Sequence, residues 1–374
     1  DSTIVLLTLP DILINILVGG ALSAALIPNM VSKPTQAKML AFQASLVLFF
    51  VFVIVSNFLY FYSEQVVSLF APGFSGNLKS LTHEGIKYIV FVIPFFVITG
   101  VLTAYLHSRE KFTIPSLGTL LFNSVVILFL IVMSKTDSYS VELIAIAVLS
   151  AGLVRYVSQL IMVIYTHDPS GFLGTWLIDK NIMKRYFQAM LSGSLIFIFP
   201  VMARSFSTFS GEGSLSIFSY AMRLVEFPLL ISVTFITILF LPKFAKSFEL
   251  NFNKFKEQLL YACQFVLVVG LSSSTILIAA TDTYVELVYG SSFSMSVLNE
   301  IKLLVRVGLI GLLFQGFVMV FISALNATKK TSIPMKVNFV TALLLFLFLS
   351  VFKNEMSLEG IMSSLVMTYL GMFF

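Results

Sequence analysis

Apolar stretches of about 20 residues recur along the whole 374-residue chain. An α-helix of about this length crosses a hydrocarbon core of about 30 Å, because it rises 1.5 Å per residue. The strands of membrane barrels are shorter and alternate apolar with polar residues, so strands do not explain these runs. We place eleven membrane spans, each to within about three residues: 2–31, 40–62, 84–107, 113–134, 141–165, 186–209, 214–242, 257–281, 298–325, 331–352 and 357–374.

The composition agrees with this placement. Hydrophobic residues make up 58% of the chain and charged residues 11%, against roughly 45–50% and about 25% in soluble domains. The connections are short, the longest being 63–83 and 166–185, so we expect no folded domain outside the membrane. The sequence predicts an all-α polytopic bundle with two halves, 1–165 and 186–374, joined by a cytoplasmic linker at 166–185.

The basic residues are distributed unevenly between the predicted loops. If the first span runs toward the cytoplasm, fourteen lie on the cytoplasmic side and five on the other. The cytoplasmic set is Lys33, Lys38, Arg109, Lys111, Lys180, Lys184, Arg185, Lys243, Lys246, Lys254, Lys256, Lys329, Lys330 and Lys336. The outer set is Lys79, Lys87, Lys135, Lys302 and Lys353. This is the positive-inside pattern, so the net charge of +5 reflects membrane topology and does not indicate a nucleic-acid partner.

Residues for enzymatic or metal chemistry are sparse. Cys263 is the only cysteine, and the three histidines lie far apart in the sequence, so we expect no metal site. No glycine-rich loop ends in Gly-Lys-Ser/Thr, and no nucleophile stands with a base, so we expect neither a cofactor nor an enzyme. The acids of the outer loops, including Asp282 and Glu286, are expected simply to solvate that face.

Four arginines lie inside predicted spans, where a charged side chain costs at least about 2.5–3.5 kcal/mol. We expect Arg155 and Arg306 to lie nearer the helix ends than these spans place them and to extend toward the headgroups. Arg204 and Arg223 are harder to explain in this way. Glu226 follows Arg223 by three residues and shares its helix face. Either the two form a structural salt bridge, or Arg223 binds an anionic headgroup while Glu226 fixes its rotamer.

Several motifs occur in an order that resembles the MurJ/MviN family of the multidrug/oligosaccharidyl-lipid/polysaccharide exporter superfamily. The stretches from Asp1 to Asp11 and from Gly20 to Pro28 resemble its second helix. Ala71-Pro72-Gly73-Phe74 matches its A-P-G-F turn, and Phe112 to Pro115 with Asn123 resembles the start of its fifth helix. The most specific match runs from Gly213-Ser214-Leu215-Ser216 through Tyr220-Ala221-Met222-Arg223-Leu224, Glu226 and Pro228 to Leu241-Pro242.

The resemblance implies a fourteen-helix fold of which this chain carries the second to the twelfth helix. It also implies a flippase that passes undecaprenyl-diphosphate-linked glycans, typically lipid II, to the outer leaflet of the bacterial inner membrane without ATP. Cavity arginines of the family hold the diphosphate, and Arg223 and Arg204 match that role, with Glu226 beside them. Asp1 and Asn15 fall on family motif positions and are further candidate substrate-binding residues.

The chain also departs from the family. Ile14, Asn15 and Gly19 replace two arginines and a glutamate, and Met222 replaces an aspartate. A less basic cavity makes a related lipid-linked oligosaccharide a candidate beside lipid II. The main alternative is a cation-coupled exporter of small amphipathic molecules on the same fold. A scaffold without transport activity is a third alternative. The sequence identifies no coupling ion.

Overall fold

Long apolar helices form nearly all of the structure. The computed structural model describes residues 1–17, 21–136, 140–166, 175–180, 182–184, 186, 197–328 and 332–374, and these residues contain no strand. The helices are α1 (Ser2–Leu17), α2 (Ala21–Ser32), α3 (Ala37–Phe61), α4 (Ser63–Phe70), α5 (Gly76–Ile89), α6 (Ile93–Ser108), α7 (Thr113–Lys135), α8 (Val141–Tyr165), α10 (Ile198–Ser207), α11 (Ser214–Leu250), α12 (Phe252–Ala279), α13 (Thr281–Tyr289), α14 (Met295–Ala327), α15 (Ser332–Phe352) and α16 (Leu358–Phe373). Short 3₁₀ turns lie at Pro34–Gln36, Val90–Val92 and Thr208–Ser210.

Seven helices in the described part of the chain are long and apolar enough to cross a membrane. They are Pro34–Phe61, Gly76–Ser108, Thr113–Lys135, Val141–Tyr165, Phe252–Ala279, Met295–Ala327 and Ser332–Phe352. The shorter apolar helix Leu358–Phe373 follows them. The all-α membrane bundle predicted from the sequence is therefore confirmed.

Most predicted span limits agree closely with the helices. The predictions 113–134 and 141–165 fall within one residue of α7 and α8. The prediction 2–31 covers two helices, α1 and α2, and residues 18–20 between them lie outside the described part. Of the prediction 186–209, α10 is described and residues 187–196 are not.

Polar side chains mark where several helices begin. Ser140 accepts a hydrogen bond from the Leu143 amide at 3.2 Å at the start of α8, and Asn251 accepts one from the Asn253 amide at 2.9 Å at the start of α12. Such caps satisfy backbone donors that have no partner inside the helix. Hence the short polar connections fix the helix limits that the apolar runs leave open.

Contacts divide the described chain into two units. One comprises Ser2–Phe70 and Phe74–Phe197 and is called here the N-terminal unit. The other comprises Asp1, Ala71–Gly73 and Ile198–Phe374 and is called the C-terminal unit. This division falls beyond the linker at 166–185 that the sequence predicts.

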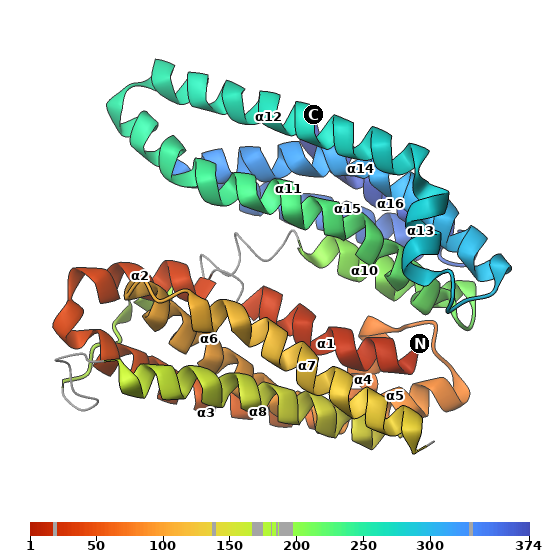
Figure 1. Ribbon diagram of the computed structural model, residues 1–374, viewed down its shortest axis with the longest axis horizontal. Helices are drawn as coiled ribbons and strands as arrows, with labels where there is room; N and C mark the ends of the chain where they lie inside the picture. The colour runs from red at the N-terminus through yellow and green to blue at the C-terminus, as the bar shows by residue number, and fades with distance from the viewer. Residues whose placement is uncertain are drawn as a thin grey trace. The chain divides into compact units, whose positions relative to one another are not determined.

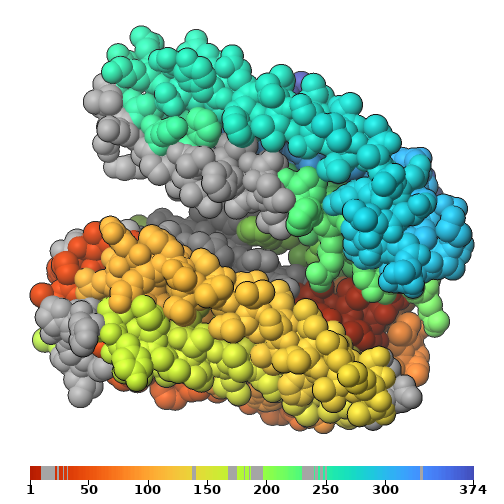
Figure 2. Space-filling model, in the orientation of Figure 1, coloured from red at the N-terminus to blue at the C-terminus, as the bar shows by residue number. Residues whose placement is uncertain are grey.

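In the N-terminal unit, α6 is the central helix. It packs on α2, α3 and α8, and twelve of its sixteen residues are buried, including Tyr105 with no exposed surface. By contrast, α7 packs mainly along α8 and exposes Leu120 and Leu128, each at 61%. Figure 2 shows α7 (yellow) and α8 (yellow-green) as one continuous surface of this unit. Exposed leucines of this kind are suited to contact with lipid chains.

In the C-terminal unit, α14 is the central helix and contacts α11, α12 and α16. The long helices α11, α12 and α14 run alongside one another in Figure 1. Phe244, Phe255 and Phe317 form part of a core among α11, α12 and α14, and Phe373 of α16 packs against it. The packing of α14 therefore decides how the polar side chains of this unit meet.

Gly308 allows the close approach of α14 to its neighbours. A Cβ atom there would lie 2.6 Å from Cγ2 of Val225 in α11 and 3.2 Å from Sδ of Met362 in α16. We predict that Gly308→Val lowers stability by about 1–3 kcal/mol, because the branched Val225 side chain has little freedom to move. Thermal unfolding in detergent measures this, and Gly371→Val is the matched control because a Cβ at Gly371 meets no atom within 4 Å. Equal melting temperatures for the two variants would contradict the prediction.

Candidate functional site

Arg223 is carried by the 37-residue helix α11, near its N-terminal end. It follows the first residue of α11 by nine positions, about 14 Å at 1.5 Å per residue, and so lies inside the span 214–242 that the sequence predicts. Its side chain is exposed. Among the described residues no ion pair involves Arg223. A cation at this depth needs a partner or water, so Arg223 is the strongest candidate for binding an anion.

Glu226 pairs with Arg204. Nη2 of Arg204 in α10 donates to Oε1 of Glu226 in α11 at 2.8 Å, and the two side chains are 17% and 32% exposed. The prediction that Glu226 pairs with or orients Arg223 is therefore wrong. The sequence suggested the pair from a three-residue spacing, whereas the packing of α10 on α11 offers Glu226 a second arginine. As a result, Arg204 is neutralised and Arg223 is not.

Two further polar residues lie near this ion pair, and the sequence analysis missed both. Tyr369 of α16 is 3% exposed, and its phenol interacts electrostatically with both Arg204 and Glu226. Nε2 of Gln315 in α14 lies 3.3 Å from the Tyr369 hydroxyl. The only sign of them in the sequence is that a glutamine and a tyrosine occur in apolar spans. Gln315 follows Arg204 by 111 positions and Tyr369 follows Gln315 by 54, so these side chains come together only through packing. The C-terminal unit thus contains a polar cluster of side chains from α10, α11, α14 and α16.

The short helix α13 lies against the turn of α11 that carries Arg223. The Tyr284 hydroxyl donates to the Leu224 carbonyl at 3.1 Å, and the Tyr289 hydroxyl donates to the Tyr220 carbonyl at 3.4 Å. Burial raises the pKa of Tyr289, and the positive charge of Arg223 opposes that rise. Because the charge acts on Tyr289, Arg223 lies near this tyrosine pair. The guanidinium is therefore near an aromatic surface, and no described acid forms an ion pair with it.

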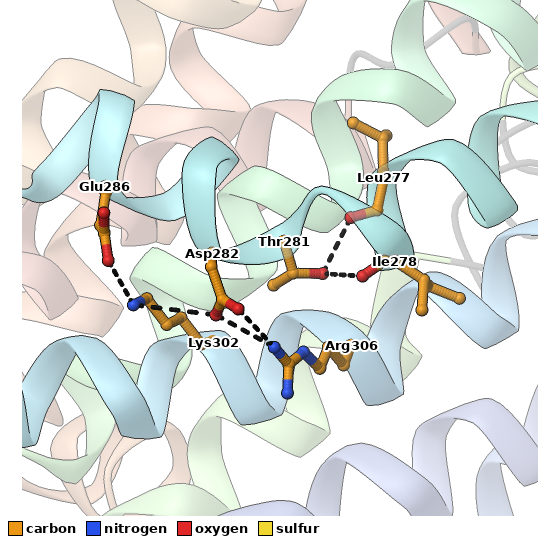
Figure 3. A network of polar contacts seen from close by, with 7 residues as sticks. All are labelled: Leu277, Ile278, Thr281, Asp282, Glu286, Lys302 and Arg306. Atoms are coloured by element: carbon orange, nitrogen blue, oxygen red, sulfur yellow. Dashed lines mark hydrogen bonds and ion pairs between the residues drawn. The ribbon is translucent and has the colours of Figure 1, made fainter.

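Three ion pairs join α13 to α14, as Figure 3 shows. Nζ of Lys302 lies 2.6 Å from Oε1 of Glu286 and 3.7 Å from Oδ1 of Asp282, and Nη2 of Arg306 lies 2.9 Å from Oδ2 of Asp282. These acids therefore pair with basic side chains and do not simply solvate the face, as the sequence analysis expected. Arg306 stays 48% exposed, and its extension toward the headgroups stays a prediction. Since α13 follows α12 directly, its acids are positioned over the basic side chains at the start of α14. The network is neutral, so it serves to hold α13 and not to bind an anion.

Asp1 caps a helix in the structure. One of its carboxylate oxygens accepts from the Gly213 amide at 2.6 Å, and the other accepts from the Ser216 amide at 2.9 Å and the Ser216 hydroxyl at 2.6 Å. A carboxylate at a helix N-terminus satisfies free amides and favours the helix dipole. The Asn15 side chain lies outside the described residues. Contact of either residue with a substrate stays a prediction.

We predict that Glu226→Gln and Arg204→Met each lower stability, by about 1–3 kcal/mol, because each leaves a partly buried charge without its partner. Combining them removes both charges, so the double variant should lose clearly less than the sum of the single effects. Thermal unfolding of the four proteins in one detergent measures the coupling. Strictly additive losses would show that the Arg204–Glu226 contact has no coupling energy.

Comparisons with known proteins support a transport fold. A structure described as lipid II flippase MurJ in an inward closed conformation superimposes with a TM-score of 0.85 at 19% identity, covering 100% of this chain and 79% of that one. An inward-facing multidrug resistance MATE transporter gives 0.83 at 14% identity, covering 99% and 87%. At these identities the likeness establishes the fold.

The sequence comparisons are more specific. The chain is 27% identical over 365 residues to a protein named probable lipid II flippase MurJ from Buchnera aphidicola subsp. Acyrthosiphon pisum, covering 92% of this chain and 70% of that protein. A protein of the same name from Buchnera aphidicola subsp. Schizaphis graminum is 26% identical, with 92% and 69% covered. The family model described as lipid II flippase MurJ matches residues 1–374. This chain, with its apolar helices and its arginines in α10 and α11, therefore belongs to the lipid II flippase MurJ family of multi-pass bacterial inner-membrane proteins.

Proposed function

We propose that this protein carries a lipid-linked glycan, with lipid II the first candidate, from the cytoplasmic to the outer leaflet of the inner membrane. The match to the flippase family over the whole chain carries this proposal. Arg223, which lies inside a predicted span and has no acidic partner among the described residues, supports it, because a diphosphate that crosses the bilayer needs a cation within the membrane. The reaction moves a molecule without changing its bonds, so the proposed role is transport and not catalysis.

Arg223 is the proposed principal contact for the diphosphate. A guanidinium offers several donors in one plane and matches two phosphate oxygens at once. Arg204 already donates to Glu226, so a phosphate would have to compete with a carboxylate for it. Asp1 and Asn15 are secondary candidates at the substrate. Binding of the diphosphate should therefore depend more on Arg223 than on Arg204.

The proposed mechanism is alternating access between two halves, 1–165 and 186–374, joined through 166–185. In this mechanism a rocking motion exposes the bound headgroup first to one side and then to the other. The protein would need no ATP, and the membrane potential or a coupled ion would supply the driving force, since moving one charge through 100 mV corresponds to about 2.3 kcal/mol.

One alternative has a specific observation in its favour. The fold is shared with a multidrug resistance MATE transporter at a TM-score of 0.83, so cation-coupled export of small amphipathic molecules stays a second candidate. A cationic substrate would require an acidic site, but Glu226 is paired with Arg204 and Arg223 has no acidic partner among the described residues. The charges near α11 therefore favour an anionic substrate.

We predict that Arg223→Ala in the full-length protein abolishes complementation of a flippase-depleted strain and lowers lipid II translocation in proteoliposomes at least tenfold. Arg223→Lys should keep part of the activity, because it preserves the charge and loses the planar fork. Lys254→Gln is the control, since it removes an exposed basic residue of the same unit that holds no element beside Arg223. Normal growth of the Arg223→Ala strain at normal membrane levels would refute the role of Arg223.

A flux assay separates the two transport functions. Full-length protein in liposomes is given either fluorescent lipid II or a lipophilic cation with an imposed sodium or proton gradient. The flippase proposal requires movement of lipid II. Gradient-driven movement of the cation without any lipid II translocation would support the exporter and overturn the proposal.

A further inference from the structure

A groove with a cavity volume of about 710 Å³ runs along the N-terminal unit among α3, α6 and α8. Sites for small molecules have about 300–1,000 Å³. Aromatic rings form much of the wall: Phe42, Phe49 and Phe50 come from α3, Phe95 from α6 and Tyr156 from α8. The Phe95 ring packs against Phe49 at 6.3 Å and Tyr156 at 6.1 Å between centroids. The groove is apolar along its length and suits a hydrocarbon chain.

One end of the groove is basic. Lys38, the second residue of α3, lines the groove and is only 8% exposed. None of the described residues that line the groove is acidic. An ammonium group at the end of an apolar groove is complementary to a molecule with a hydrocarbon chain and an anionic head.

Two further cations lie at the same end. Nη2 of Arg109 donates to the Pro34 carbonyl at 2.6 Å, immediately before α3. Nζ of Lys111 donates to the Thr166 hydroxyl at 3.4 Å, and Thr166 follows the groove residue Val163 by three positions. All three cations belong to the set that the loop charges assign to the cytoplasmic surface. The groove therefore opens toward a leaflet whose lipids include anionic headgroups.

We propose that this groove binds an anionic phospholipid of the cytoplasmic leaflet. Its phosphate lies at Lys38, within the field of Arg109 and Lys111, and an acyl chain lies along Phe49, Phe95 and Tyr156. Basic pockets between transmembrane helices on the cytoplasmic side bind lipid headgroups in this manner. The proposed occupant is a bulk lipid of this leaflet and not the transported substrate.

Ser45 offers a way to block the groove without changing its charge. It lines the groove, and its hydroxyl is buried with no hydrogen-bond partner in the described structure. A larger side chain at this position in α3 would project into the space assigned to the acyl chain. Ser45→Phe therefore tests the chain, and Lys38→Gln tests the headgroup.

Native mass spectrometry of the full-length protein tests the proposal with phosphatidylglycerol and phosphatidylcholine of identical acyl chains. The wild type should retain phosphatidylglycerol in preference to phosphatidylcholine. Lys38→Gln should weaken phosphatidylglycerol binding about fivefold, the effect of one basic residue near an anionic lipid, and Ser45→Phe should reduce binding of both lipids. Lys254→Gln, which removes an exposed lysine of the C-terminal unit, should leave binding unchanged.

Three results would overturn the proposal. One is equal retention of phosphatidylglycerol by the wild type, Lys38→Gln and Ser45→Phe, with all three folded by their melting temperatures. Another is an equal loss with Lys254→Gln, which would indicate charge attraction without a site. The third is tight binding of undecaprenyl phosphate at Lys38 without phosphatidylglycerol binding, which would assign the groove to the isoprenoid chain. Because each readout is lipid binding, these results stay independent of the translocation assay on Arg223.

Discussion

The absence of water from the hydrocarbon core is the constraint on which this structure depends. Each backbone amide and carbonyl must find its partner within the chain, so apolar segments form helices long enough to span the core. Seven helices of the described chain meet that requirement by length and composition. The same constraint acts on side chains, since a charge inside the core needs an opposite charge, a wet cavity or a bound ligand.

The C-terminal unit contains one arginine that is paired with an acid and one that is not. Arg204 is compensated by Glu226 at 2.8 Å, with Tyr369 and Gln315 close by. Arg223 lies one helical turn from Glu226 and has no acidic partner in the described chain. Pairing one arginine internally leaves the other to recognise an anion. A protein that carries a diphosphate through the membrane needs an arginine without an acidic partner, because a fully neutralised cluster would have little affinity for the headgroup.

The remaining charged groups have structural or lipid-related roles that follow from their depth. Lys302 and Arg306 bind Glu286 and Asp282 and so hold α13, whose tyrosines donate to the α11 carbonyls beside Arg223. These contacts link α13, α11 and α14 around the proposed substrate contact. In the N-terminal unit, Lys38 lines one end of an apolar groove. Cations near the membrane surface are stabilised by acids or by lipid phosphates, and only those at depth are available to a transported headgroup.

The sequence alone determined the helical membrane fold, because the length of each apolar run is a local property that the bilayer selects. The limits of α7 and α8, the positive-inside loop pattern and the family resemblance were likewise readable from consecutive residues. Only the tertiary structure decided which polar and charged side chains contact one another. Glu226 has Arg223 three residues away in sequence, yet it binds Arg204, twenty-two residues away, because α10 packs against α11. Tyr369 and the α13 network were missed for the same reason: which side chains meet depends on which helix faces pack together, and helical periodicity does not specify the neighbour.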